Sequence, residues 1–234
     1  MAGKCKNGGS SPADGGKSMR IVILGPSGAG KGTQAKALIE HFGLKHISTG
    51  DVLREEVKKD NVLSRAVKRL MDRGDLVPDE LMLSVVEGIL VEESNFILDG
   101  FPRTFSQTLA LDAICNRIKA PIEVAISISC PDDEIIQRIT GRTVCPKCTE
   151  MFHTVFLPPK QDGICDKCGT ALYQRPDDTK ETVKRRLQLF HDLTDPIIDF
   201  YRRKDILISV DGKGDIGQIT QQLIKQLEEK FGKS

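Results

Sequence analysis

The residues best suited to chemistry begin with a glycine-rich stretch, Gly25-Pro26-Ser27-Gly28-Ala29-Gly30-Lys31-Gly32-Thr33. It follows the apolar run Ile21–Leu24, and residues 31–41 have a helical pattern. Glycines in such a turn let several backbone N–H groups point at one anion, at the N-terminus of the next helix. Lys31 adds a mobile cation for phosphate, and Thr33 adds a hydroxyl that can reach Mg²⁺. The strict motif has Ser or Thr directly after the lysine, whereas here one glycine intervenes. The pattern predicts a nucleoside triphosphate site, in preference to an ordinary glycine-rich turn.

Other polar residues are placed to hold a second anion. Arg54 falls in the first turn of a helix that we expect to be capped by Thr49 or Asp51, and a cation there is mildly unfavourable unless an anion shares the site. Asp99 ends a buried strand, at the sheet edge where open α/β folds bind ligands, so its carboxylate could hold Mg²⁺ or its waters. Arg103 follows a Phe-Pro corner that fixes its direction. Each residue alone would usually be an ordinary solvated side chain. Only the ordered set indicates a second site.

These stretches resemble the nucleoside monophosphate kinases, and adenylate kinase in particular, through Lys31-Gly32-Thr33-Gln34, Ser48–Arg54, Leu76-Val77-Pro78-Asp79-Glu80 and Gly100–Gln107. The similarity runs from about residue 20 to the C-terminus. It implies that ATP and Mg²⁺ bind the glycine-rich loop, with the metal held largely through water by Thr33 and Asp99. It implies an AMP site in which two arginines take the phosphate, a valine packs near the base and a glutamine reads the adenine edge: Thr49, Arg54, Val77, Gly100, Arg103 and Gln107. The loop sequence Pro26-Ser27-Gly28 is more similar to that of guanylate kinases. The motifs that the resemblance assigns to AMP lie elsewhere in the chain and do not depart from the family pattern.

Four of the seven cysteines form two pairs, Cys145-x₂-Cys148 and Cys165-x₂-Cys168. Together they offer four thiolates for tetrahedral Zn²⁺, and because no position is left for water we expect a structural metal. Disulfide or redox use of these pairs is the less favoured alternative. The surrounding insert resembles the long zinc-bearing lid of some adenylate kinases, although Leu157 stands where the family usually has Asn.

Arginines flank this insert on both sides. Arg138 and Arg142 are four residues apart, and we expect them on one helix face, where like charges repel unless an anion lies between them. The resemblance implies that these two contact ATP, and that Arg175 and Arg186 bridge the donor and acceptor phosphates when the lid closes. The adjacent pair Asp177-Asp178 either orients the arginines or caps the following helix.

The elements that must position these residues alternate between strands and helices. Short apolar runs predict buried strands at 21–24, 96–98, 122–128 and 206–210. Helical patterns cover 31–41, 51–59, 63–73, 80–92, 106–116, 131–140, 179–203 and 216–231. This order predicts an α/β fold with a mostly parallel sheet covered on both faces, of the P-loop NTPase type by resemblance. We expect a disordered tail (1–18), a core (19–47, 78–140 and 179–234), a helical NMP-binding segment (48–77) and a small zinc-binding β lid (141–178).

The charge balance excludes a generally cationic surface, since 34 Lys and Arg face 33 Asp and Glu in 234 residues. No bulk field attracts nucleic acid or an anionic membrane, so any bound anion needs a local cluster of cations. No apolar run approaches the roughly 18–20 residues of a membrane span, and the odd cysteine count does not fit a secreted disulfide framework. We therefore expect an intracellular protein, cytoplasmic with an organelle left open, and a monomer by resemblance.

The resemblance implies reversible phosphoryl transfer, MgATP + AMP = 2 ADP, by phosphate positioning and charge stabilisation under a closing lid. The catalytic group would be Lys31, Arg103, Arg138, Arg142, Arg175 and Arg186. GTP as the donor, or another monophosphate as the acceptor, is the alternative within enzymes. A P-loop regulatory or RNA-binding protein with a zinc ribbon is the alternative from another class, and the lack of a basic stripe in the insert argues against it.

Overall fold

Five strands form a central sheet in the order β2-β3-β1-β4-β7, and every neighbouring pair is parallel. The computed structural model describes residues 18–58 and 62–232, so nearly all of the predicted tail lies outside the described residues. The strands are β1 (Arg20–Leu24), β2 (Lys45–Ser48), β3 (Phe96–Asp99), β4 (Val124–Ser129) and β7 (Leu207–Asp211). The predicted α/β fold with a parallel sheet is confirmed.

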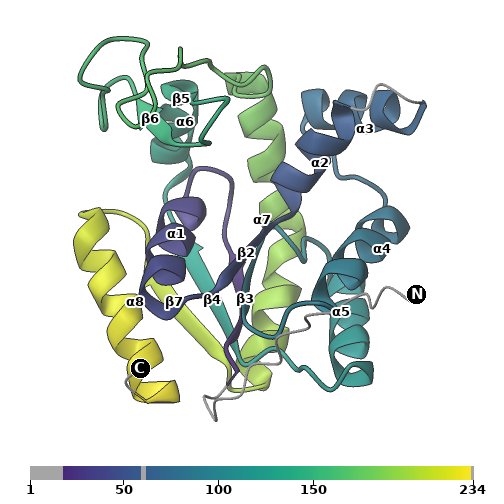
Figure 1. Cartoon of the computed structure of the whole chain (residues 1–234). Coiled ribbons are helices and arrows are strands. Elements are labelled where there is room, and N and C mark those ends of the chain that lie inside the picture. The colour runs from purple at the N-terminus through teal and green to yellow at the C-terminus, as the bar shows by residue number, and fades with distance from the viewer. Residues whose placement is uncertain (1–17, 59–61, 233–234) are drawn as a thin grey trace, which may run out of the picture.

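Helices cover both faces of this sheet (Figure 1). On one face lie α1 (Lys31–Phe42) and α8 (Ile216–Phe231), and on the other lie α4 (Asp79–Leu90), α5 (Phe105–Arg117) and α7 (Lys180–Arg203). Strand β1 shows why, because its alternate side chains enter two different cores. Ile21 and Ile23 pack in the cluster with α1 and α8, whereas Val22 and Leu24 pack in the cluster with α4, α5 and α7. A strand buried on both faces reads as a continuous apolar run.

Two smaller lobes stand above the carboxyl ends of the strands (Figure 1). One contains α2 (Thr49–Val57) and α3 (Val62–Arg73), within the predicted NMP-binding segment. The other follows α6 (Asp132–Thr140) and contains the antiparallel pair β5 (Arg142–Val144) and β6 (Met151–His153), within the segment 141–178, which we call the lid. None of the described helices combines the length and the apolar character needed to cross a bilayer.

The sequence patterns missed strand β2. Lys45 and His46 are exposed and only Ile47 is deeply buried, because β2 is an edge strand covered on part of its length. Such a strand lacks the apolar run by which the other strands were found.

Two local expectations were wrong. Helix α2 begins at Thr49 with Ser48 as its cap, since the Ser48 hydroxyl accepts from the Asp51 backbone N–H at 3.3 Å, and Arg54 therefore lies in the last turn rather than the first. Helix α6 ends at Thr140, so Arg142 belongs to β5 and does not share a helix face with Arg138.

Candidate active site

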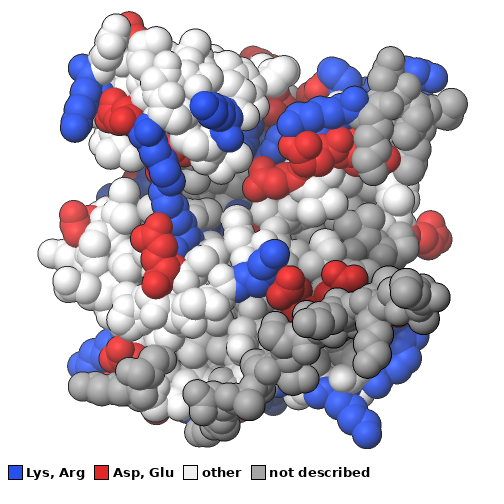
Figure 2. All heavy atoms as spheres, viewed as in Figure 1, with Lys and Arg blue, Asp and Glu red and all other residues white. Residues whose placement is uncertain are grey.

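All the predicted nucleotide-binding residues line one cleft of about 1240 Å³. Its floor is formed by the carboxyl ends of the parallel strands, where the register places Ser48 of β2 and Ile23 of β1 on either side of Asp99. Its walls are α2, the lid and the start of α7. Figure 2 shows a hollow between the two upper lobes and the body, with side chains of both charge signs along it.

The glycine-rich loop between β1 and α1 packs closely against α6. Gly28 has φ 90°, and a Cβ there would lie 2.8 Å from Cγ1 of Ile139, so both the conformation and the packing require glycine. The Lys31 ammonium donates to the Pro26 carbonyl oxygen at 3.0 Å and thus stays over the loop. The pKa of Lys31 is lowered to about 8, chiefly by burial and to a smaller extent by nearby arginines, against the opposing charge of Asp99. A phosphate would reverse this effect.

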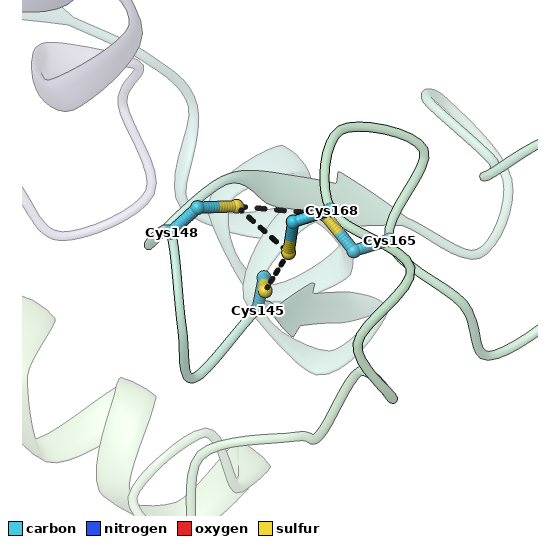
Figure 3. Close-up of side chains that lie close together, drawn as sticks. All are labelled: Cys145, Cys148, Cys165 and Cys168. Atoms are coloured by element: carbon cyan, nitrogen blue, oxygen red, sulfur yellow. Dashed lines mark hydrogen bonds between the residues drawn. The ribbon is translucent and has the colours of Figure 1, made fainter.

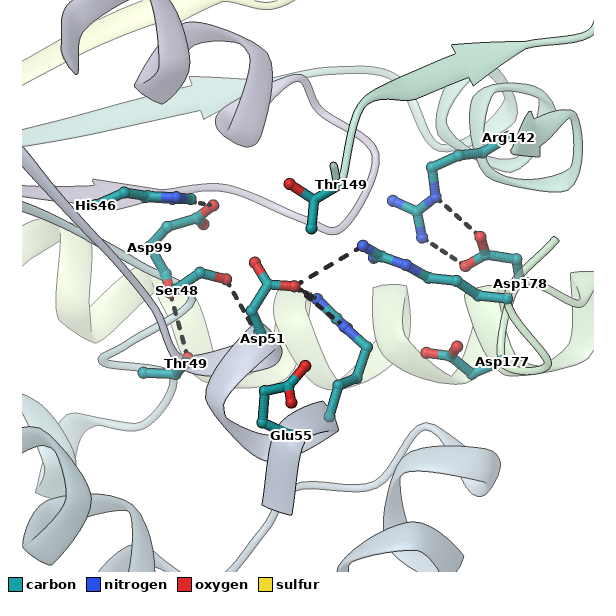
Figure 4. Close-up of polar contacts among 12 residues, drawn as sticks. His46, Ser48, Thr49, Asp51, Glu55, Asp99, Arg142, Thr149, Asp177 and Asp178 are labelled. Carbon is teal, nitrogen blue, oxygen red and sulfur yellow. Dashed lines mark hydrogen bonds and ion pairs between the residues drawn. The ribbon is translucent and has the colours of Figure 1, made fainter. Parts of the chain in front are cut away.

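Asp99 lies at the end of β3 with its side chain 14 % exposed, 3.7 Å from Nε2 of His46. Burial raises its pKa, but the neighbouring His46 ring and the charge of Lys31 outweigh burial and hold the pKa below its ordinary value. The carboxylate is therefore ionised at neutral pH, which suits Mg²⁺ or its water ligands. Figure 4 shows Asp99 facing His46, with Thr49 beside it donating to the Asp99 carbonyl oxygen at 3.2 Å.

Arg103 is held beside the same strand end. Its Nε donates to the Gly100 carbonyl oxygen at 2.7 Å, and its own backbone N–H donates to Oε1 of Gln107 at 2.7 Å. Gly100 has φ 83°, and a Cβ there would lie 2.9 Å from the Thr49 hydroxyl. Burial and the charge of Arg186 lower the pKa of Arg103 against the opposing charge of Asp99, so the two arginines repel each other.

Carboxylates hold two further arginines in place, and Figure 4 shows the pair of Arg142 with Asp178. Asp178 accepts two hydrogen bonds from Arg142, and Asp177 accepts one from Arg186 at 2.6 Å. The prediction that this acidic pair orients arginines is confirmed, because the cap of α7 is Thr179 instead.

The Asp51 carboxylate serves two arginines at once. It accepts from Arg54 at 2.5 Å and lies 3.9 Å from Arg175. Burial and the charges of Arg54 and Arg142 lower the pKa of Arg175, and its buried Nε has no hydrogen-bond partner among the described residues. A buried charged donor without a partner is costly, so this group fits an anion that approaches it from the cleft.

The four lid cysteines converge as their spacing predicts (Figure 3). Their sulfur atoms all lie within 4.8 Å of one another, with Cys145 and Cys168 3.4 Å apart and Cys148 and Cys165 3.5 Å apart. Zinc–sulfur bonds of about 2.3 Å in a tetrahedron place sulfurs about 3.8 Å apart, so the donor set fits this ion.

The two cysteine turns share one backbone design. The amide N–H of Thr149 donates to the Cys145 carbonyl oxygen at 3.0 Å, and the N–H of Gly169 donates to the Cys165 carbonyl oxygen at 2.9 Å. The residue after each second cysteine is left-handed, with φ 58° at Thr149 and 70° at Gly169. Each turn therefore aims its two sulfurs toward one side.

The family model described as Adenylate kinase matches residues 23–206 of this chain. The chain belongs to the adenylate kinase family. It is 45% identical to an adenylate kinase of Caldicellulosiruptor saccharolyticus over 212 residues, which is 89% of this chain and 99% of that protein. It is 46% identical to one of Archaeoglobus fulgidus over 90% of this chain and 98% of that protein, and 44% identical to one of Methanosarcina barkeri over 91% and 100%. The resemblance seen in the motifs is confirmed.

Sequence reasoning missed two stretches that line the cleft of this adenylate kinase family member. The loop 212–215 follows β7, and Arg138 of α6 donates to its Gly212 carbonyl oxygen at 2.9 Å. Residues 151–153 form β6 of the lid. Met151 lies near the glycine-rich loop, since a Cβ on Gly32 would be 3.4 Å from Cε of Met151. Gly212 and Gly214, shortly after the strand predicted at 206–210, were the available signal for the first stretch.

Proposed function

We propose that this adenylate kinase family member catalyses reversible phosphoryl transfer, MgATP + AMP = 2 ADP. The observation that carries the proposal is that the glycine-rich loop with Lys31 faces a second, arginine-lined half of the same cleft, around Arg54 and Arg103. The charge of Arg186 lowers the pKa of both Lys31 and Arg103, so it acts on both halves. Two phosphate sites that share their cations suit transfer from one nucleotide to another.

On the donor side, the loop amides and Lys31 would bind the β- and γ-phosphates of ATP. The residues that we assign to ATP are Gly28, Ala29, Gly30, Lys31, Gly32, Thr33, Arg138 and Arg142. Thr33 and Asp99 would hold the Mg²⁺ of the MgATP complex, largely through water. Bound Mg²⁺ supplies neutralisation of charge on the transferred phosphoryl group.

On the acceptor side, Arg54 and Arg103 would bind the AMP phosphate, Val77 would pack near the base and Gln107 would hydrogen-bond the adenine edge. Thr49 and Gly100 complete this half, and it is reached by Arg175 at the end of the lid and by Arg186 of α7. The unpartnered Nε of Arg175 supports the assignment, because a phosphate oxygen would satisfy it.

The reaction needs no general base in this arrangement. The attacking group is a phosphate oxygen of AMP, which is already ionised at neutral pH because the second phosphate pKa is about 6. Catalysis then consists of holding two phosphates in line and stabilising the charge that develops between them, the work of Lys31, Arg103, Arg138, Arg142, Arg175 and Arg186. Closure of the lid over the cleft would keep water from taking the phosphoryl group.

We assign a structural role to zinc, held by Cys145, Cys148, Cys165 and Cys168. All four positions would be filled by protein thiolates, so the ion would order the lid and take no part in the transfer. The balanced net charge supports a protein that binds ATP, AMP and ADP but neither nucleic acid nor membranes, and the free cysteines fit a cytoplasmic setting. By family resemblance we propose a monomer.

A coupled ADP assay tests the proposal by pairing ATP or GTP with AMP, CMP or GMP. We expect ADP formation with ATP and AMP, and little with CMP or GMP as acceptor. Equal turnover with GTP as donor would favour a GTP:AMP phosphotransferase. Absence of transfer from either donor would contradict the proposal.

A further inference from the structure

The Asp79 carboxylate lies at the junction of two helix N-termini and gathers three side-chain donors. Its Oδ2 accepts from the hydroxyls of Thr104 at 3.2 Å and Ser106 at 2.5 Å, and its Oδ1 accepts from Nε2 of Gln107 at 2.7 Å. Asp79 is the first residue of α4, directly after the segment that carries Val77, and the three donors belong to the cap and first turn of α5. The proposed mechanism gives Asp79 no role.

These contacts fix which end of the Gln107 amide is the donor. Oε1 accepts from the Arg103 backbone N–H at 2.7 Å, while Nε2 donates to Asp79. A flipped amide would set its NH₂ group against the Arg103 N–H and its carbonyl oxygen against a carboxylate. Gln107 is only 2 % exposed, so water cannot compensate for either mismatch. The amide therefore has one orientation.

The fixed amide still has hydrogen-bonding capacity for a ligand. A primary amide offers two N–H donors and two acceptor lone pairs, and its two contacts with Asp79 and Arg103 use one of each. Gln107 also lines the cleft, so the remaining donor and acceptor are available to a base there.

This remaining pair distinguishes two kinds of purine. Adenine carries an amino donor at C6 and a bare acceptor at N1, which complement a carbonyl oxygen and an N–H group. A 6-oxopurine carries an acceptor at C6 and a donor at N1, so in the same pose it would face the amide donor to donor and acceptor to acceptor. Only a flipped amide would accept it, and Asp79 opposes that flip.

We propose that Asp79 is a positioning residue that makes the acceptor site select 6-aminopurine over 6-oxopurine monophosphates, by fixing the orientation of the Gln107 amide. The inference rests on the proposed function, in which Gln107 reads the base of AMP. An asparagine at this position can present either its oxygen or its NH₂ to Gln107, while the Ser106 and Thr104 hydroxyls can donate or accept as required. Asp79→Asn therefore removes the carboxylate's share of the constraint with little change in shape, and only the Arg103 N–H still opposes the flip.

The test compares AMP with IMP as acceptors, with MgATP as donor, in the wild type, Asp79→Asn and Asp79→Ala. IMP differs from AMP only at the 6-position and in the proton at N1. We expect the ratio of kcat/KM for AMP to that for IMP to fall roughly tenfold or more in both variants, chiefly through KM, as expected when a buried polar mismatch is relieved. Glu80→Gln, which neutralises the exposed neighbouring carboxylate on α4, serves as the control and should keep the wild-type ratio.

If Asp79 had a purely structural role, its substitution would weaken turnover with both acceptors alike and leave the ratio unchanged. That result would overturn the inference. ADP formation from ATP and AMP would still support the proposed function. In a Gln107→Ala background, Asp79→Asn should no longer change the ratio, because the two residues act through one contact. A full ratio change in that background would also overturn it. Failure of the wild type to use AMP would instead count against the proposed function.

Discussion

The Asp178 carboxylate accepts two parallel hydrogen bonds from the Arg142 guanidinium, from Nε to Oδ2 at 2.8 Å and from Nη2 to Oδ1 at 2.5 Å. The Asp178 side chain is fully buried and that of Arg142 is 18 % exposed, so the pair joins the first strand of the lid to the chain just before α7 with little help from solvent. Such a bidentate pair is strong, and it is expensive to leave one partner alone.

Asp178→Asn should lower the free energy of unfolding by about 2–4 kcal/mol, because it leaves a largely buried arginine without its counter-charge. Chemical denaturation monitored by circular dichroism measures this loss. Asp199→Asn is the matched control, since Asp199 pairs with Arg202 in solvent and its loss should cost less than about 1 kcal/mol. Equal effects of the two substitutions would contradict the buried-pair interpretation.

Lys31→Ala and Arg103→Ala should each reduce kcat by about 10²-fold or more while the fold persists, since each removes a cation from the proposed phosphate sites and neither belongs to the hydrophobic core. Steady-state kinetics with ATP and AMP, together with unfolding curves, measure the two effects separately. Near wild-type turnover with either variant would contradict the assignment of that residue to the phosphate sites.

The pKa of Lys31, lowered to about 8 by burial, predicts proton uptake on nucleotide binding. Below pH 8 the ammonium is already charged and binding takes up no proton. Above pH 8 the free protein is mostly neutral at Lys31, whereas a bound phosphate favours the charged form and raises the pKa. The affinity for MgATP should therefore fall as pH rises through 8, by up to about tenfold per pH unit.

Calorimetric titration with MgATP at pH 9, in buffers of different ionisation enthalpy, reports the number of protons taken up. We expect a value near one at pH 9 and near zero at pH 6.5. If both pH values give zero, the lysine is not titrating in this range, and the claimed effect of burial is wrong.

Local patterns were sufficient to predict the glycine-rich loop and the cysteine turns. Their geometry is set within a few residues, as the matching left-handed positions at Thr149 and Gly169 illustrate. Helix caps were less predictable, because Ser48, Thr49 and Asp51 are all good caps and only the path of β2 into α2 makes Ser48 the one that is used.

Contacts between distant segments could not be predicted from spacing at all. The ion pair of Lys36 with Glu150 joins residues 114 apart, and the hydrogen bond of Gln107 to Asp79 crosses from one helix to another. Each depends on where the sheet and the lid place whole elements, and a single sequence carries no periodic or spacing signal for that placement.

Cys145→Ser and Cys168→Ser should each lower both the bound zinc and the melting temperature, because the lid has a small apolar cluster built around its cysteines. Elemental analysis of the purified protein and scanning calorimetry measure the two quantities. Cys130→Ala is the matched control, since Cys130 lies outside the sulfur cluster, and it should retain one zinc per chain. Full zinc content and unchanged stability in the serine variants would defeat the structural role.

Lys36 on α1 donates to Glu150 of the lid at 2.6 Å, directly beside the Met151 that approaches the phosphate loop. This ion pair connects the lid to the core across the mouth of the proposed ATP site, so breaking it should shift the lid toward positions that bind ATP less well. We expect Lys36→Glu to raise KM for ATP about 2–5-fold with a smaller change in KM for AMP, and to have little effect on stability, since Lys36 is half exposed. Initial rates at varied ATP and AMP measure both constants.

Two further variants separate this contact from a general effect of charge near the phosphates. In Lys36→Glu, Glu150→Lys the pair can form again with opposite polarity and the net charge equals that of the wild type, so KM for ATP should return toward the wild-type value. Lys45→Glu, which breaks the Lys45–Glu93 pair within the core, makes the same charge change without touching the lid and should leave KM for ATP unaltered. If Lys45→Glu raised KM for ATP as much as Lys36→Glu does, long-range repulsion of ATP would explain the effect. If the double variant kept the raised KM of the single variant, the lid contact would not explain it. High salt should reduce the difference between Lys36→Glu and the wild type, because both partners are at least partly exposed and their attraction is screened within about 10 Å at 0.1 M ionic strength.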